Sequence, residues 1–241
     1  MSDVEKELAR RTRRGFITAA LAAGAGFASY KWLRARPREG GTQWPLRRTL
    51  EVNEALSTAY FSRSRLSPQF RRQDISRARI NGGLGLKGTV DPGEWRLNIE
   101  GAQQPFMLTL DEVKALPRHE MITELRCIEG WSTIVQWAGA RLSDLVARYP
   151  PAEEPHYVAL ETPDRGYYVG LDAESALHPQ TLLAWEMNGA PLPNLHGAPL
   201  RLAIPVKYGI KNIKRIGTIR YTTTRPADFW TERGYDWYAG H

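Results

Sequence analysis

The sequence has 241 residues, of which 42% are hydrophobic and 24% are charged, and its formal net charge is +7. A chain of this length and apolar content can bury a core, which excludes wholesale disorder, and its single cysteine excludes an intramolecular disulfide framework and a cysteine-based zinc cluster. Residues 1–79 carry 17 of the 33 Lys and Arg residues but only 7 of the 26 Asp and Glu residues, so the remainder is close to neutral. That remainder shows no basic stripe with interleaved aromatics, which argues against nucleic-acid binding.

Residues 1–36 have the composition of an export signal. A basic stretch that contains Arg13 and Arg14 is followed by 16 uncharged residues, Gly15 to Tyr30, and then by a second basic stretch. A charged segment before a short apolar one is typical of secretory signals, and the run is shorter than the ~20 residues of a membrane span. Residues 12–18 resemble the twin-arginine signal up to Ile17. We expect a twin-arginine signal that directs the chain to the periplasm and is either cleaved or kept as an N-terminal anchor. The alternative is a basic amphipathic helix on a membrane surface.

Residues 37–79 show no clear helical or strand period, and six arginines are scattered through their second half. The pattern predicts a basic extended arm that holds at most one short helix. A run of small residues, Asn81 to Gly85, then interrupts the chain. We therefore place the start of a single globular domain at residue 80 and its end at residue 241.

From Trp95 onward, local signals predict short elements. Apolar and polar residues alternate from Trp95 to Ile99, which predicts a strand with one buried face, and Thr109 with Glu112 forms a capping box for a helix that Pro117 ends. Further strands are expected over 121–127, 157–161, 181–187, 200–204 and 213–223, and helices over 142–149 and 172–177. The Asn188-Gly189 pair between strands favours a tight turn. Short helices among unevenly spaced strands predict an α+β fold and not a regular βαβ array.

The single cysteine, Cys127, ends a predicted strand just before a turn at Gly130. A thiol at a strand end faces the loops, where functional groups usually lie. The alternatives are an inert buried thiol and a Cys–His nucleophile, although the spacing signatures of such proteases are absent. The five histidines show no metal-ligand spacing. A metal here would therefore arrive with its own ligands and gain one thiolate, a ligand that suits soft metals.

Several separated motifs resemble the sulfite oxidase family, and within it most closely the catalytic subunit of the bacterial periplasmic protein-methionine-sulfoxide reductase. These motifs follow one another in the family's order over about residues 80–226: residues 126–132, 137–142, 160–162, 177–182, 196–202 and 205–214. The resemblance implies a sulfite oxidase-type molybdopterin-binding fold of mixed β-sheets and short helices. It also implies a molybdenum-molybdopterin cofactor (Mo-MPT) whose metal takes Cys127 as its protein ligand.

The same resemblance, carried over position by position, implies the residues that contact the cofactor. They are Asn81, Gly82, Cys127, Thr162, His196, Arg201, Asn212, Ile213 and Lys214. Asn212 stands where the family has glycine, which raises a question about the backbone there. Without the resemblance, Arg201 and Lys214 are equally well explained as residues on a solvent-exposed face of a strand. Asn81-Gly82 is then explained as an ordinary glycine-rich turn. Glu129, two residues after the cysteine, either delivers a proton or is a structural carboxylate that accepts hydrogen bonds from loop N–H groups.

The resemblance implies an exported oxidoreductase that transfers an oxygen atom, by reducing a small or protein-bound sulfoxide-type substrate. One alternative is a sulfite oxidase-type dehydrogenase that passes electrons to a cytochrome. The other is a cofactor-free binding module on the same fold. The sequence has no haem-binding motif, so electrons must come from or go to another protein, and the resemblance implies a membrane b-type cytochrome as the donor. The aromatic tail after Phe229 either packs on the domain or docks this partner.

Overall fold

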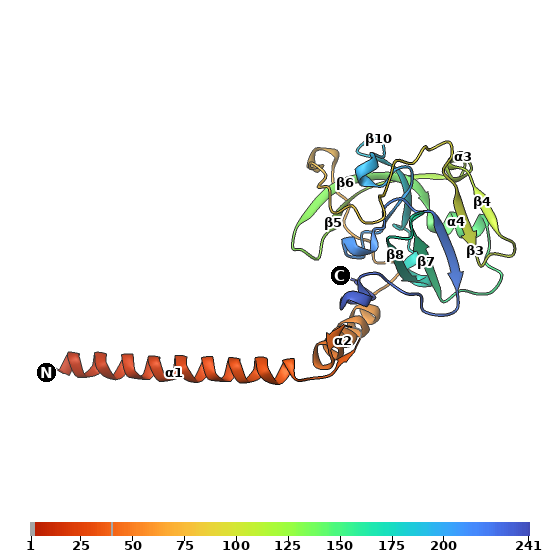
Figure 1. The fold of residues 1–241 in the computed structure, drawn as a ribbon. Coiled ribbons are helices and arrows are strands. Elements are labelled where there is room, and N and C mark those ends of the chain that lie inside the picture. The colour runs from red at the N-terminus through yellow and green to blue at the C-terminus, as the bar shows by residue number, and fades with distance from the viewer. Residues whose placement is uncertain (1–2, 40) are drawn as a thin grey trace. The chain divides into compact units, whose positions relative to one another are not determined.

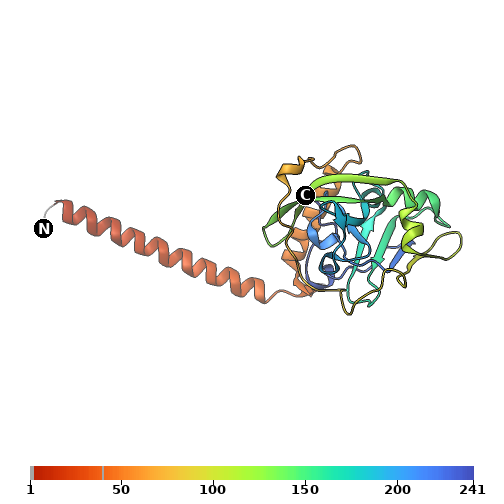
Figure 2. The same ribbon diagram turned by 90° about the horizontal axis from the view of Figure 1, so that it is seen from above.

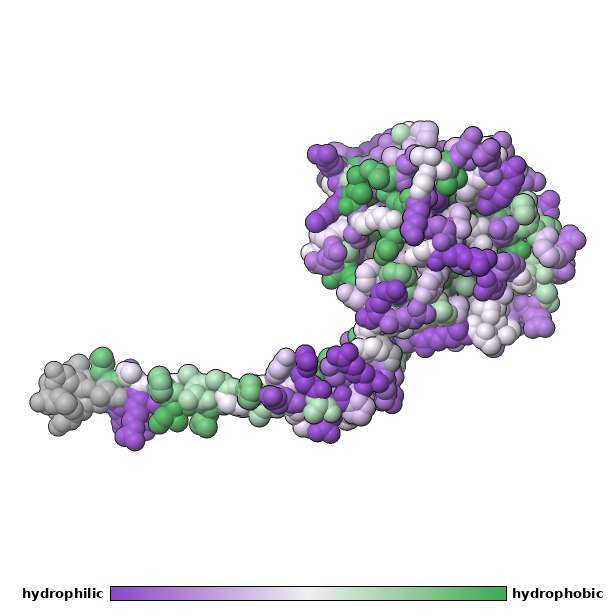
Figure 3. Space-filling view, in the orientation of Figure 1, coloured by the Kyte–Doolittle hydropathy of each residue, from purple (hydrophilic) through white to green (hydrophobic). Residues whose placement is uncertain are grey.

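The computed structural model describes residues 3–39 and 41–241, and it divides into two compact units, Met1–Leu50 and Glu51–His241. The first unit contains helix α1 (Asp3–Arg34), the short antiparallel pair β1 (Arg38–Glu39) and β2 (Thr42–Gln43), and the start of α2 (Trp44–Tyr60). Figures 1 and 2 show α1 as one continuous helix. Its uncharged stretch appears as the green band of Figure 3. In this stretch Phe16, Leu21 and Phe27 are exposed. Among the described residues, no helix combines the length and the apolar composition that a membrane crossing requires.

Helix α2 is longer than the short helix expected in the arm. It has 17 residues and begins with Pro45 in its first turn, where the missing N–H of proline costs nothing. None of its residues is buried. A helix without a buried face needs no apolar period, and this explains why the sequence pattern did not reveal its length.

The second unit is built from two five-stranded sheets that lie on either side of its core. Sheet one has the order β10-β9-β6-β5, with β11 also paired to β9, and sheet two has the order β4-β3-β12-β7-β8. Strand β12 runs parallel to β3, and the other pairs are antiparallel. These mixed sheets confirm the predicted fold class.

The bounds of the strands and helices in this unit are as follows. Sheet one holds β5 (Arg118–Arg126), β6 (Ser132–Arg141), β9 (Leu182–Met187), β10 (Ala190–Pro191) and β11 (Arg201–Ala203). Sheet two holds β3 (Leu97–Glu100), β4 (Phe106–Leu108), β7 (Tyr157–Glu161), β8 (Tyr168–Asp172) and β12 (Thr218–Thr222). The helices are α3 (Leu110–Lys114), α4 (Leu142–Arg148) and α5 (Ala173–Ala176), with 3-10 turns η1 (Arg72–Asp74), η2 (Asn194–His196), η3 (Gly209–Lys211) and η4 (Thr231–Arg233).

Local capping signals act as the sequence predicts. The hydroxyl of Thr109 accepts a hydrogen bond from the Glu112 amide at 3.2 Å, and the Glu112 carboxylate accepts one from the Thr109 amide at 2.7 Å. Asp172 caps α5 by accepting from the Ser175 amide at 2.8 Å. The N-termini of α3 and α5 thus each depend on two residues three positions apart, so the local sequence is sufficient to specify them.

The last predicted strand is shorter than expected, because residues 213–217 are not part of β12. In this stretch the carbonyl of Ile213 accepts from the Leu202 amide, next to sheet one, whereas the carbonyl of Gly217 accepts from the Asn98 amide of sheet two. The segment thus passes from one sheet to the other, and only after the crossing does it form strand β12, which lies between β3 and β7.

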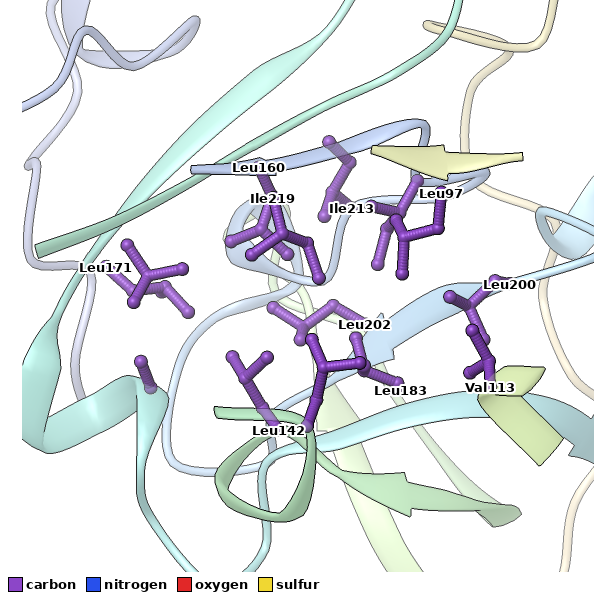
Figure 4. Close-up of a cluster of buried hydrophobic side chains, with 14 of the residues drawn as sticks. Leu97, Val113, Leu142, Leu160, Leu171, Leu183, Leu200, Leu202, Ile213 and Ile219 are labelled. Carbon is purple, nitrogen blue, oxygen red and sulfur yellow. The ribbon is translucent and has the colours of Figure 1, made fainter. Parts of the chain in front are cut away.

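The main core lies between the two sheets, as the inward-facing leucines and isoleucines of Figure 4 show. Alternate residues of a strand point to opposite faces. In β9, Leu183 therefore enters this core, while Leu182 and Ala184 join a second cluster with Met121 and Trp137 on the outer face of sheet one. This outer face carries the candidate site.

The arm packs on the same outer face. The Phe70 amide donates to the Ile122 carbonyl at 2.9 Å and the Ser76 amide to the Ile134 carbonyl at 3.1 Å. The arm therefore follows both strands of the β5–β6 hairpin, and residues 51–79 belong to the compact unit, whereas the sequence places the domain start at residue 80. The aromatic tail also packs back, because Trp237 and Tyr238 are buried and the Ala239 carbonyl accepts from the Tyr208 amide.

Candidate functional site

Cys127 lies at the tip of the β5–β6 hairpin, in a turn that fixes its position. Its amide donates to the Trp131 carbonyl at 2.9 Å, and its carbonyl accepts from the Gly130 amide at 3.1 Å. Gly130 has a φ of +85°, a conformation that favours glycine. The cysteine is 5% exposed. The turn thus holds the thiol at a defined point at the end of sheet one.

The thiol opens into a cavity of about 150 Å³ on the outer face of sheet one. Three segments far apart in the sequence form most of its walls: residues 78–84 at the end of the arm, residues 125–137 of the hairpin, and residues 196–214 of the loops around β11. Gly209 comes close behind the cysteine, since a β-carbon there would lie 3.7 Å from the Cys127 Cα. The cavity exists only because these segments meet in the folded unit.

A buried arginine forms one wall of the cavity. Arg201 is 3% exposed, and its guanidinium donates to the carbonyls of His196 at 2.9 Å and Asn212 at 3.1 Å. It also lies over the Trp137 ring, 4.6 Å from the centroid. Burial lowers the pKa of Arg201 to about 10, so the group is still charged at neutral pH. Its position within β11, beside two loops, lets it hold both of them with one rigid fork.

Two further basic groups lie beside Arg201. The Lys214 ammonium donates to the carbonyls of Asn81 at 2.5 Å, Gly82 at 3.0 Å and Leu195 at 3.1 Å. Burial, with a smaller effect of Arg201, lowers the pKa of Lys214 to about 8. Burial also lowers the pKa of His196, which favours the neutral imidazole at pH 7.

These cations lack the acidic partners that buried charges normally require. In the described part of the chain, neither Arg201 nor Lys214 forms an ion pair with a carboxylate, and Glu129 is the one acidic residue that lines the cavity. An uncompensated positive charge of this kind favours an anion. The site therefore suits a ligand with a phosphate or a similar anionic group.

The thiol itself suits a metal. Burial raises the pKa of the Cys127 thiol, and the Asn81 side chain opposes this effect by donating to the sulfur at 3.4 Å. Among the described residues, no group of three or more His, Cys, Asp and Glu side chains could hold a metal ion. A metal at Cys127 would need most of its donor atoms from a bound cofactor.

The structure brings most of the predicted contact residues to this cavity. Asn81, Gly82, Cys127, Glu129, His196, Arg201, Asn212 and Lys214 line it. Asn212 has a φ of −83°, so the asparagine replaces the family's glycine without backbone strain. Its side chain holds the end of β11, accepting from the Ile204 amide at 2.9 Å.

Two predicted contact residues do not line the cavity. Ile213 is fully buried in the core between the sheets. Thr162 is also buried, and its hydroxyl donates to the Asp164 carboxylate at 2.7 Å while its methyl group packs below Gly85. The Ile213 and Thr162 side chains therefore lie beneath the cavity walls and do not face the cavity.

Glu129 is exposed at the mouth of the cavity. Its carboxylate accepts a hydrogen bond from the Trp131 indole N–H at 2.8 Å, and the Arg79 guanidinium lies over the Trp131 ring, 4.9 Å from the ring centroid. The Glu129 carboxylate thus accepts a hydrogen bond from an N–H group of its own loop, which agrees with the alternative that Glu129 is a structural carboxylate. The same position places Glu129 beside Cys127, two residues along the chain, at the edge of the cavity.

Sequence reasoning missed the aromatic residues that complete the cavity. Tyr167, Trp230 and Tyr235 line it, and the Tyr167 hydroxyl donates to the Ile210 carbonyl. Trp230 and Tyr235 stack edge to face at 5.1 Å. Trp230 lies in a region that the sequence treats as tail, and Tyr167 precedes a strand that the sequence does not predict. No local signal pointed to either.

Comparison with known proteins identifies the family of this fold. Residues 84–230 match the family of the oxidoreductase molybdopterin binding domain. The chain is 38% identical over 158 residues to the protein-methionine-sulfoxide reductase catalytic subunit MsrP of Xanthomonas campestris, covering 59% of this chain and 49% of that protein. MsrP of Ralstonia nicotianae is 35% identical over 159 residues, covering 59% and 48%.

The chain thus spans about half the length of these relatives. Among solved structures, the sulfane dehydrogenase SoxCD of Paracoccus pantotrophus matches with a TM-score of 0.54 and 20% identity, covering 57% of this chain and 40% of that one. At this identity the likeness establishes a shared fold. The family match covers more than half of the chain and contains the Cys127 loop, the buried Arg201 and the partly buried Lys214. The chain therefore belongs to the family of oxidoreductases with a molybdopterin-binding domain.

Proposed function

We propose that this protein binds Mo-MPT at Cys127 and reduces a sulfoxide-type substrate. One observation carries the proposal: a lone thiol opens into a cavity lined by the buried Arg201 and the partly buried Lys214, and in the described part of the chain neither cation pairs with a carboxylate. The relatives named methionine-sulfoxide reductase support the choice of substrate class. The Cys127 sulfur would bind the metal, and Arg201 and Lys214 would neutralise the phosphate of the pterin.

The residues of the site fit this cofactor in charge and in hydrogen-bonding capacity. No acidic residue among those the structure describes pairs with Lys214 and would compete with a phosphate. His196, kept neutral by burial, can both donate and accept at the polar edges of a pterin. When bound, the cofactor supplies the metal that exchanges an oxygen atom and accepts electrons. The chain supplies the Cys127 thiolate, the positive charges of Arg201 and Lys214, and the walls of the cavity.

Reduction of a sulfoxide to a thioether breaks the S–O bond, consumes two electrons and two protons, and releases the oxygen as water. Glu129 stands at the mouth of the cavity and would deliver a proton there. Trp131, Trp230 and Tyr235 would shield the reacting sulfur from bulk water. The electrons would come from a separate donor, for which a membrane b-type cytochrome is the candidate, with the enzyme located in the periplasm after twin-arginine export.

The test uses protein produced in a host that makes the cofactor. We expect about one molybdenum per chain, and turnover of a sulfoxide with a reduced dye as electron donor. C127S should lose the turnover and change the molybdenum EPR signal, while its circular dichroism stays that of the parent. Oxidation of sulfite without sulfoxide reduction would instead establish the dehydrogenase alternative.

A second measurement tests anion binding in the cavity separately from metal binding. Millimolar phosphate or pyrophosphate should raise the melting temperature of the cofactor-free protein, because a ligand that binds only the folded state stabilises it. R201Q should lose most of this increase, whereas R220Q, which alters a surface arginine paired with Glu100, should keep it. Equal protection of both variants would refute the assignment of the cavity to an anion.

A further inference from the structure

The side-chain amide of Asn81 points at the sulfur of Cys127. Its Nδ2 lies 3.4 Å from the Sγ, a normal distance for a hydrogen bond to sulfur. A thiolate that binds a metal has no proton, so it can only accept, and an amide nitrogen is a matching donor. Among the described side chains, Asn81 is the one for which a hydrogen bond to this sulfur is seen.

The backbone that carries Asn81 is held in place although the residue is exposed. Lys214 donates to the carbonyls of Asn81 and Gly82, and also to that of Leu195 on the neighbouring loop. Gly82 has a φ of +57°, which lets the chain turn here. Lys214 thus joins the arm to the loop before β11, and the amide of Asn81 is fixed relative to the hairpin.

A hydrogen bond to a metal-bound thiolate changes the electron density that the sulfur can give to the metal. Donation from an N–H group withdraws charge from the sulfur, which favours the more reduced metal and raises the reduction potential. The backbone amides of Ile128 and Glu129 also stabilise the thiolate, but side-chain substitution leaves them unchanged. The Asn81 side-chain amide is therefore the hydrogen-bond donor to the Cys127 sulfur that an amino-acid substitution can remove.

We propose that Asn81 is a positioning residue that raises the reduction potential of the bound molybdenum through its hydrogen bond to Cys127, with Lys214 holding it in place. This inference rests on the proposed binding of Mo-MPT. It assigns to Asn81 a role through the metal ligand and not through the pterin.

The experiment compares N81A and N81D with the parent protein, all loaded with cofactor. N81D keeps the shape of the side chain but cannot donate at neutral pH, and N53A is the matched control because Asn53 is an exposed residue of α2. Midpoint potentials are measured by EPR-monitored redox titration at equal molybdenum content. Loss of the donor should shift the equilibrium for one-electron reduction about tenfold towards the oxidised metal, or ~59 mV to lower potential.

N81A and N81D should both show this shift, with altered molybdenum EPR parameters, and N53A should show neither change. An unchanged potential in N81A and N81D with full metal content would overturn the inference and leave cofactor binding intact. Loss of the cofactor from both variants would assign Asn81 to cofactor binding and would also overturn it. Absence of molybdenum from the parent protein would instead refute the proposed function.

Discussion

The buried ion pair between Lys211 and Asp228 offers a quantitative test of how the site is supported. The two side chains are 1% and 2% exposed, and their charged atoms lie 2.5 Å apart. Lys211 ends the 3-10 turn η3 directly before Asn212, while Asp228 lies in the tail and also accepts from the Gly170 amide at 3.2 Å. The pair therefore connects the loop behind Cys127 with the tail and with sheet two.

D228A should leave the Lys211 ammonium buried with the Gly170 carbonyl as its remaining acceptor. Removing one partner of a buried ion pair costs about 3–5 kcal/mol. For a unit of this size, each kcal/mol changes the melting temperature by roughly 2–4 °C, so the expected loss is about 6–20 °C. Replacing both partners in K211M/D228A removes the uncompensated charge and should recover part of this loss, because the two effects are coupled.

The assays are urea unfolding, for the free energy, and thermal unfolding, for the melting temperature, of the cofactor-free parent, both single variants and the double variant, each followed by tryptophan fluorescence. E100Q serves as the control, because Glu100 pairs with Arg220 on the surface and should change stability by less than ~1 kcal/mol. Two results would refute the reasoning: a loss below ~1 kcal/mol in D228A, or single-variant losses that simply add in the double variant.

Three further outcomes are expected. Replacing Arg13 and Arg14 together by Lys should trap the chain in the cytoplasm, which cell fractionation measures; normal export would show another route. E129Q should lower sulfoxide turnover about 10²-fold at unchanged metal content and alter the pH–rate profile, because a general acid typically contributes at least this much; an unchanged profile would leave Glu129 a structural role. Burial lowers the pKa of Lys207 to about 7, so the unfolded state binds more protons between pH 7 and 10 and the Lys207 contribution to stability rises with pH there. K207M should therefore flatten this part of the stability–pH curve, and parallel curves for parent and variant would contradict the shift.

The sequence alone was sufficient for elements whose signals are local. The capping box at Thr109, the cap at Asp172 and the turn at Asn188-Gly189 each depend on residues within a few positions, and all three appear in the structure. The cysteine loop and the order of the motifs were also sufficient to predict the fold class and the family. Helix α2 was underestimated because it buries no face and leaves no apolar period to detect.

The site itself was decided by tertiary structure. Whether a motif residue lines the cavity depends on which way its strand or turn faces, and this is why Lys214 contacts the cavity while its neighbour Ile213 enters the core. Tyr167 and Trp230 reach the cavity from segments that carry no motif. The hydrogen bond from Asn81 to Cys127 joins residues 46 positions apart and depends on a third segment, which contributes Lys214. The sequence determined which chemical groups this protein has, and the packing of the arm, the hairpin and the β11 loops decided which of them meet, because such contacts form only when distant segments are brought together by a common core.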